Sequence, residues 1–185
     1  MVPGCLMQLF VHPFLNLPLE TVRRWSKILV IAFLVTTVIL GTVVPAEHRS
    51  AIANFVLADA ALAPAELSRW DSATRESFQF VLGFDFLYDL VHNNLVAMLL
   101  AWGAILSAQR WALQLASAFA WILWMDTALN LLEHFIYRHL LATGILEPWH
   151  SYGMAIFNFR TSTLVAGALI AAVIHISVFY KRWSS

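Results

Sequence analysis

An apolar run over residues 111–141 contains four polar side chains at helical spacing, and this run constrains the fold most strongly. It is long enough to cross a bilayer, which takes about 20 residues of helix. Asp126, Asn130, Glu133 and Tyr137 share one face of such a helix. A carboxylate inside a membrane span costs roughly 3 kcal/mol unless it is paired or hydrated. This face is therefore expected to turn toward the protein interior.

The composition agrees with a membrane protein. Of the 185 residues, 61% are hydrophobic and only 12% are charged, whereas a soluble domain carries about a quarter charged residues. The net charge is zero, so there is no electrostatic case for a nucleic-acid partner. The single cysteine, Cys5, excludes an intramolecular disulfide. We therefore predict one integral membrane domain of the all-α class.

Four apolar runs predict four membrane-spanning helices. The predicted spans cover about residues 25–44, 78–107, 111–141 and 158–180. Three prolines interrupt residues 1–24, which predicts an interfacial segment rather than a span. A long polar or weakly amphipathic segment, residues 46–78, follows the first span, and Asp71 is expected to cap the second helix. A loop is predicted over residues 144–153. Only residues 108–110 separate the second and third spans, which predicts an antiparallel four-helix bundle.

The basic residues next to the predicted spans favour one orientation. On one side of the predicted bundle lie Arg23, Arg24, Lys27, Arg110, Lys181 and Arg182. On the other side, basic residues are spread over longer loops and mixed with acids. The positive-inside rule therefore predicts that both termini are cytoplasmic, and we expect a protein of the bacterial inner membrane.

A second polar stripe lies on the second predicted span. Its members are Asp85, Tyr88, Asp89 and His92, and Asn93 and Asn94 flank it. At a rise of about 1.5 Å per residue from the short link, His92 and Asp126 both lie at a depth of roughly 22 Å. Asp85 and Glu133 both lie at about 33 Å, and Arg160 of the fourth span reaches about 30 Å. The sequence therefore predicts one polar layer in the outer leaflet, built by three helices.

The predicted polar layer holds the candidate functional residues. The candidate catalytic residues are Asp89, His92, Asp126 and Glu133. The candidate ligand-binding residues are Asp85, Tyr88, Asn93, Asn130, His134, Tyr137, Asn158 and Arg160. Buried acids that repel one another tend to retain a proton, and general acid–base chemistry uses this arrangement. Arg160 supplies the cation that such acids need.

Four interpretations of the polar layer stay open. The layer could be a structural polar network, a functional proton, ligand or catalytic site, a metal site, or a bis-histidine haem site. Asp89-x-x-His92 resembles half of a carboxylate-bridged dimetal motif, but the facing helix offers Asn130-x-x-Glu133 instead of a second such half. His134 points away from the stripe, which speaks against haem. The sequence contains no Gly-x-Ser-x-Gly, phosphate-loop or HExxH motif. We predict no metal ligands, and the cofactor is unknown.

Two segments of the chain resemble known membrane proteins. The segment Leu82-Gly-Phe-Asp85-Phe-Leu-Tyr88, with Asp126-x-x-x-Asn130, resembles a group of uncharacterised small bacterial four-span proteins. In the second half, residues 91–93, 128–133 and 157–158 resemble lipoprotein signal peptidase, a four-span aspartic protease. That resemblance places Glu133 at one catalytic aspartate and Thr161 at the other. Because one carboxylate is missing, we do not predict protease activity.

Two functions remain as expectations. The first is a polar pocket open to the outer leaflet that binds a lipid-like molecule or processes it by acid–base chemistry. The second is a non-catalytic subunit of a membrane complex, in which residues 46–78 and the apolar N-terminus hold a protein partner. The lipid bilayer is the expected surrounding in both cases.

Overall fold

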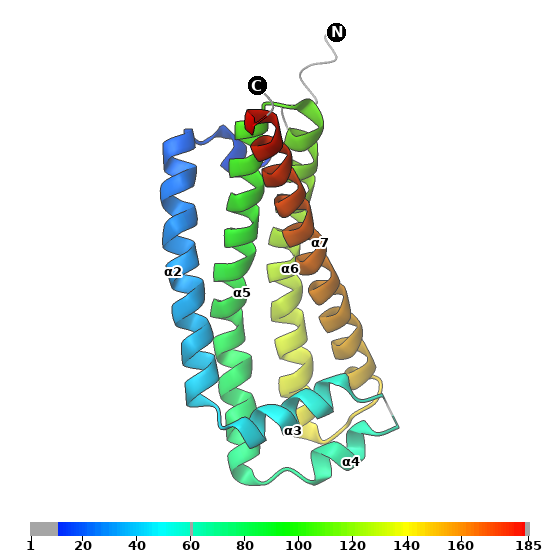
Figure 1. Ribbon diagram of the computed structural model, residues 1–185. Helices are drawn as coiled ribbons and strands as arrows, with labels where there is room; N and C mark the ends of the chain where they lie inside the picture. Colours follow the sequence, from blue (N-terminus) through cyan, green and yellow to red (C-terminus); the bar gives the residue numbers. More distant parts are fainter. Residues whose placement is uncertain (1–10, 60, 184–185) are drawn as a thin grey trace. The chain divides into compact units, whose positions relative to one another are not determined.

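The computed structural model describes residues 11–59 and 61–183 of the chain. Its elements, in order, are η1 (Pro13–Asn16), α2 (Leu19–Val43), α3 (Ala46–Leu57), α4 (Ala63–Ser68), α5 (Ser72–Ser107), α6 (Arg110–Thr143) and α7 (Trp149–Trp183) (Figure 1). The described residues contain no strand. The prediction of an all-α protein is therefore confirmed.

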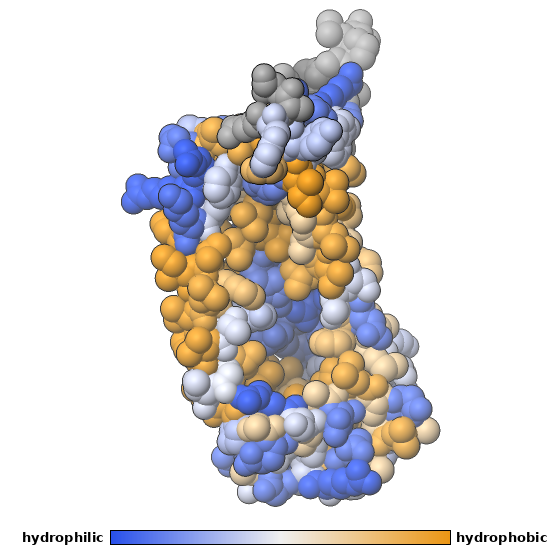
Figure 2. Space-filling view, viewed as in Figure 1, coloured by the Kyte–Doolittle hydropathy of each residue, from blue (hydrophilic) through white to orange (hydrophobic). Residues whose placement is uncertain are grey.

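Four of these helices, α2, α5, α6 and α7, are long and apolar enough to cross a membrane. The most apolar window of α2 has only 11% of its residues buried. Figure 2 shows hydrophobic side chains over the outward face of α2, at the left of the view. Such a surface needs an apolar surrounding, which a bilayer provides. The chain thus has four candidate membrane spans, as the sequence predicts.

Two helices begin earlier than predicted. Helix α2 begins at Leu19 instead of about residue 25, because Pro18 directly precedes it and no breaker follows in its first turns. Helix α7 begins at Trp149 instead of residue 158, so the predicted loop over residues 144–153 is wrong beyond Pro148. The sequence after Pro148 contains Gly153, which suggests a loop but is tolerated within a helix at a cost of about 1 kcal/mol.

Local signals explain other helix ends. The backbone N–H of Thr74 donates a hydrogen bond to Asp71 Oδ1 at 2.7 Å, which confirms Asp71 as the cap of α5. Gly144 follows α6 with φ of +69°, and its N–H donates to the carbonyl of Leu140 at 2.9 Å. A glycine with this conformation is a common stop signal at a helix C-terminus.

The chain forms two compact units. The first unit contains the described residues 11–33, 91–126 and 162–183. Small side chains build its core: Ala97, Ala104, Ala112, Ala116 and Ala120 are all buried. They let helices approach closely. At Gly103 of α5, an added Cβ would lie 2.9 Å from Ile174 Cγ2 of α7, so these two helices are in close contact.

Within the first unit, the residues before α2 are attached to α6 by His12. The backbone N–H of His12 donates to Ser117 Oγ at 2.8 Å, and its Nδ1 accepts from the N–H of Phe14 at 3.3 Å. The buried imidazole packs edge-on against Trp121 and Trp124, with ring centroids 5.0 and 4.5 Å apart. The predicted interfacial segment, residues 1–24, is helical from Leu19. Its first ten residues, which include Cys5, lie outside the described part of the chain.

His12 predicts a pH dependence of stability. Burial lowers the pKa of the His12 imidazole from 6.5 to about 4. Because the unfolded chain binds the proton more readily, the free energy of unfolding should fall as the pH is lowered from 6.5 toward 4. Thermal unfolding in detergent across this range measures the slope. His12→Asn keeps a cap acceptor but cannot titrate here, so it should reduce the slope; an unchanged slope would assign the pH dependence to other groups.

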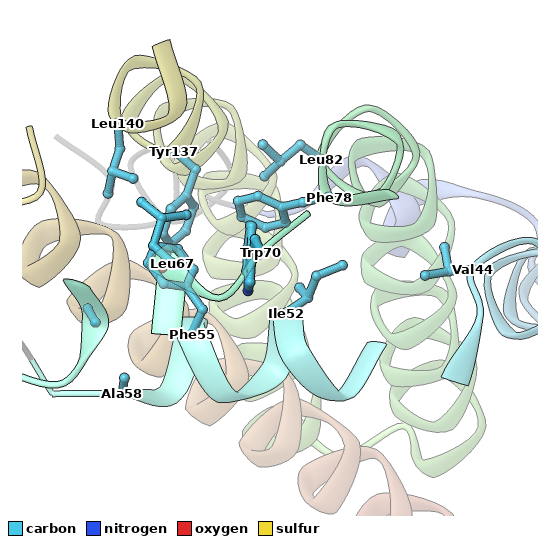
Figure 3. Packing of buried hydrophobic residues seen from close by; sticks show 11 residues of the cluster. Val44, Ile52, Phe55, Ala58, Leu67, Trp70, Phe78, Leu82, Tyr137 and Leu140 are labelled. Carbon is cyan, nitrogen blue, oxygen red and sulfur yellow. The ribbon is translucent and has the colours of Figure 1, made fainter. Parts of the chain in front are cut away.

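The second unit contains residues 34–59, 61–90 and 127–161, and its core surrounds Phe55 of α3. The ring of Phe55 is fully buried and lies edge-on to Trp70, Phe78, Tyr137 and His150, at centroid distances of 5.0 to 6.1 Å. Figure 3 shows Phe55 of α3 close to Trp70, Phe78 and Tyr137. The predicted weakly amphipathic segment is therefore packed into the core of this unit.

Candidate functional site

The second unit contains a buried ionic network centred on Arg160 of α7. Arg160 is only 7% exposed. Its guanidinium group contacts the carboxylates of Asp89 on α5 and Glu133 on α6, and lies 3.7 Å from Asp85 Oδ2. The depths counted along the predicted spans predict this contact between Arg160 and the acids. Three carboxylates therefore share one arginine, and Arg160, Asp89 and Glu133 are buried.

Asp85 is the most accessible acid of this network. Its side chain is 31% exposed, compared with 4% for Asp89 and 7% for Glu133. Asn130 Nδ2 donates a hydrogen bond to Asp85 Oδ2 at 2.8 Å. His134 Nε2 lies 3.5 Å from the same oxygen, so a side chain that points away from the polar stripe still reaches this acid. Asp85 and His134 thus bring a carboxylate and an imidazole, two groups used in acid–base chemistry, next to each other.

A pocket of about 250 Å³ lies beside this pair, entirely within the second unit. Its polar lining comes from Arg49, Asp85, Glu133, His134 and Tyr137. Its apolar lining comes from Leu40, Ile52, Ala53, Val56, Leu57, Phe78, Val81, Leu82 and Phe157. A mostly apolar cavity with a few converging polar groups is the usual form of a small-molecule site.

Tyr137 lines this pocket from α6 and is 1% exposed. Within the described residues, its hydroxyl group has no hydrogen-bond partner. Gly153 of α7 lies directly behind its ring, where an added Cβ would be 2.8 Å from Tyr137 Cζ. Gly153 therefore makes room for Tyr137, and the position of the phenol depends on the lack of a side chain there.

The variant Gly153→Ala should be destabilised by roughly 1–3 kcal/mol, because the new methyl group overlaps a fully buried ring. Gly83→Ala in α5 is the matched control, since an added Cβ meets nothing within 4 Å there. It should be neutral or up to about 1 kcal/mol more stable through its higher helix propensity. Unfolding of both variants in the same detergent measures the difference. Equal effects at the two positions would contradict this packing.

The other predicted site residues lie elsewhere. In the first unit, Asn93 Nδ2 donates to Asp126 Oδ2 at 3.0 Å, and both side chains are buried. His92 is also buried, with its ring centroid 6.4 Å from that of Phe33. Tyr88 is half-buried in the second unit.

Asn158, in contrast, is exposed on α7 and does not belong to the buried network. All four members of the stripe on α6 are buried: Asp126, Asn130, Glu133 and Tyr137. The prediction that this face of the helix turns toward the protein interior is therefore confirmed. The functional roles assigned to these residues stay predictions.

The contribution of α3 to the pocket is not predicted from the sequence. Arg49 of α3 donates hydrogen bonds to the carbonyl groups of Gly41 and Val44, at 2.8 Å for Val44, and so attaches α3 to the end of α2. Ile52 and Val56 of α3 line the pocket. The spacing of Ile52, Phe55 and Val56 is the signal that could have identified a buried helical face.

The residues of the site do not form a metal centre. Among residues 11–59 and 61–183, no group of three or more His, Cys, Asp or Glu side chains could hold a metal ion. Comparison with protein families, with curated proteins and with solved structures gives no match. The two resemblances drawn from the sequence therefore stay predictions.

Proposed function

We propose that this chain is an antiparallel four-span membrane protein whose second unit binds a single-chain amphiphile near the outer surface. Two contacts within this unit support the antiparallel course of α5 and α6. Asn130 pairs with Asp85, and the ring of Tyr137 lies 5.6 Å from that of Phe78. Residue numbers thus increase along α6 in the direction in which they decrease along α5.

The basic residues support the proposed orientation. Arg23, Arg24 and Lys27 lie in the first turns of α2, and Arg110 begins α6. With these ends in the cytoplasm, as the positive-inside rule favours, α3 follows the outer end of α2. Because α3 lines the pocket, this orientation places the pocket on the outer side, in a bacterial inner membrane.

The observation that carries the proposal is the pairing of apolar and acid–base groups in one cavity. The apolar lining suits an alkyl tail, while Asp85 and His134 suit a polar head group. A carboxylate 3.5 Å from an imidazole can accept a proton from a bound head group and return it. The proposed activity is therefore binding, with proton transfer at the head group as the chemistry available.

The alternative, a non-catalytic subunit that holds a partner through residues 46–78, is less well supported. Ile52 and Phe55 of this segment are buried in the chain's own core. The apolar face of α3 therefore packs against this chain's own core and not against a protein partner. Mass measurement after gentle purification tests the alternative, which predicts a co-purifying second protein.

A pocket-filling variant tests the proposed function. Ala53 lines the pocket and is itself exposed, so Ala53→Trp should fill the cavity without disturbing the core. An uncharged alkyl alcohol that carries a diazirine group should label peptides from α3 and α5 in the native protein. The labelling should fall about tenfold in Ala53→Trp, because the tryptophan occupies the cavity and the alcohol loses about 1.4 kcal/mol or more of its binding free energy.

The neighbouring variant Asn54→Trp is the control. Asn54 is exposed on α3 but does not line the pocket, so its labelling should match that of the native protein. The proposal fails if no labelling maps to the pocket, or if both tryptophan variants reduce it equally.

A further inference from the structure

We infer that the head group of the ligand is a protonated amine that also carries an oxygen acceptor, so that the pocket selects cationic amphiphiles. This inference rests on the proposed function and specifies its ligand class. It depends on three separate observations: the charge of the ionic network, the exposure of Asp85, and the buried hydroxyl group of Tyr137.

The charge of the network favours a cation. Asp85, Asp89 and Glu133 face one guanidinium group, that of Arg160. With the three carboxylates ionised and His134 protonated, these groups together carry one net negative charge. In a poorly hydrated site this charge attracts a cation and repels a carboxylate or phosphate head group. A protonated amine beside the network would complete its neutralisation.

Asp85 is the acid that such an amine would reach. Asp89 and Glu133 are in direct contact with Arg160 and nearly fully buried, whereas the side chain of Asp85 is 31% exposed and lines the pocket. Hydrogen bonds between a charged amine and a carboxylate are short and strong. Phe78 and Tyr137 also line the pocket, and aromatic rings add attraction for an ammonium group.

Arg49 is the arginine that lines the pocket, and its role is accounted for. Its guanidinium group donates to the carbonyl groups of Gly41 and Val44, in the last turn of α2 and just beyond it. A positive charge is stabilising at this end of a helix. Arg49 thus compensates the partial negative charge at the C-terminal end of α2. The acids that line the pocket therefore remain available to a cationic ligand.

Tyr137 supplies the second point of recognition. Its hydroxyl group is buried, lines the pocket and has no hydrogen-bond partner among the described residues. A buried polar group without a partner is unfavourable, so a ligand atom that accepts its hydrogen bond gains affinity. An oxygen atom on the ligand would accept this hydrogen bond. An amino alcohol on an alkyl chain carries both features and an apolar tail for the remaining lining.

Three matched competitors test this inference. N-dodecylethanolamine, its uncharged ether analogue and dodecyloxyacetic acid share one chain and differ in head-group charge. Each competes with the uncharged diazirine alcohol for labelling of the protein in nanodiscs of zwitterionic lipid. The concentration that halves the labelling should be about tenfold lower for the amine than for the ether, because one charge-assisted hydrogen bond raises the affinity by about this factor. The acid should compete least.

Two variants locate the effect. Asp85→Asn should bring the amine and the ether to within about threefold of each other, since the carboxylate that distinguishes them is gone. Tyr137→Phe should weaken both competitors by a similar factor, about fivefold. Glu76→Gln, which replaces an acid on α5 that does not line the pocket, is the control and should keep the native preference.

Comparing the same competitors between variants cancels their partition into the nanodisc. Equal competition by amine and ether, a preference for the acid, or a preference that survives Asp85→Asn would overturn the inference. In each of these cases the alcohol still labels the pocket, so the proposed function would stand. Absence of pocket labelling by the alcohol would instead overturn the proposed function itself.

Discussion

Replacing Arg160 with methionine is expected to lower the free energy of unfolding by roughly 3–5 kcal/mol. The substitution leaves three acids, Asp85, Asp89 and Glu133, without the cation that they share. Uncompensated charges in a buried site are far more costly than the loss of an exposed ion pair. Reversible unfolding in mixed detergent, followed by circular dichroism, measures the change.

An exposed arginine provides the matched control. Arg69 pairs with Glu66 at 2.7 Å, but 71% of its side chain is exposed. Arg69→Met should therefore cost less than about 1 kcal/mol, because water screens such a pair. A similar loss of stability for the two arginine variants would mean that the Arg160 network is not buried.

Replacing Phe55 with alanine should cost roughly 3–5 kcal/mol, because this fully buried ring fills the centre of the core of the second unit. The loss should be greatest around α3, whose attachment to the unit depends on this ring (Figure 3). Hydrogen exchange should show faster exchange for the amides of α3. Labelling of the pocket should fall as well, since α3 forms one of its walls.

Phe80→Ala is the control for this variant. Phe80 lies on α5, is 39% exposed and stacks on Phe84. Its removal should leave hydrogen exchange in α3 unchanged and cost much less stability, because its ring does not fill a core. If Phe80→Ala also made the amides of α3 exchange faster, the effect of Phe55→Ala could not be assigned to the local packing of its ring.

Much of the fold follows from local sequence signals. Apolar length identifies the candidate spans, and the spacing of Asp126, Asn130 and Glu133 identifies a buried face of α6. Both features depend on residues close in sequence. The early start of α7 escapes prediction because Gly153 resembles a loop signal, whereas its actual role is to accommodate Tyr137.

The candidate site could be predicted only in part. Counting residues along the spans predicts that Arg160 lies near the acids, because helical rise fixes depth. The same count places Asp85 level with Glu133, but the observed hydrogen bond joins Asp85 to Asn130, almost one turn away. The pocket itself could not be predicted, because it requires α3 to fold back against α5 and α6, a tertiary contact with a weak local signal.

The ionic network of the second unit is central to the proposed site, and a double-mutant cycle between Arg160 and Glu133 tests it most directly. The measurement is the free energy of unfolding for the native protein, Glu133→Gln, Arg160→Met and the double variant. In the native background, Glu133→Gln should be destabilising, since it removes a partner of Arg160. In the Arg160→Met background, the same change should be neutral or stabilising, because it removes an uncompensated buried charge. An equal cost of Glu133→Gln in both backgrounds, within about 0.5 kcal/mol, would show that the two groups do not interact and would contradict the proposed site.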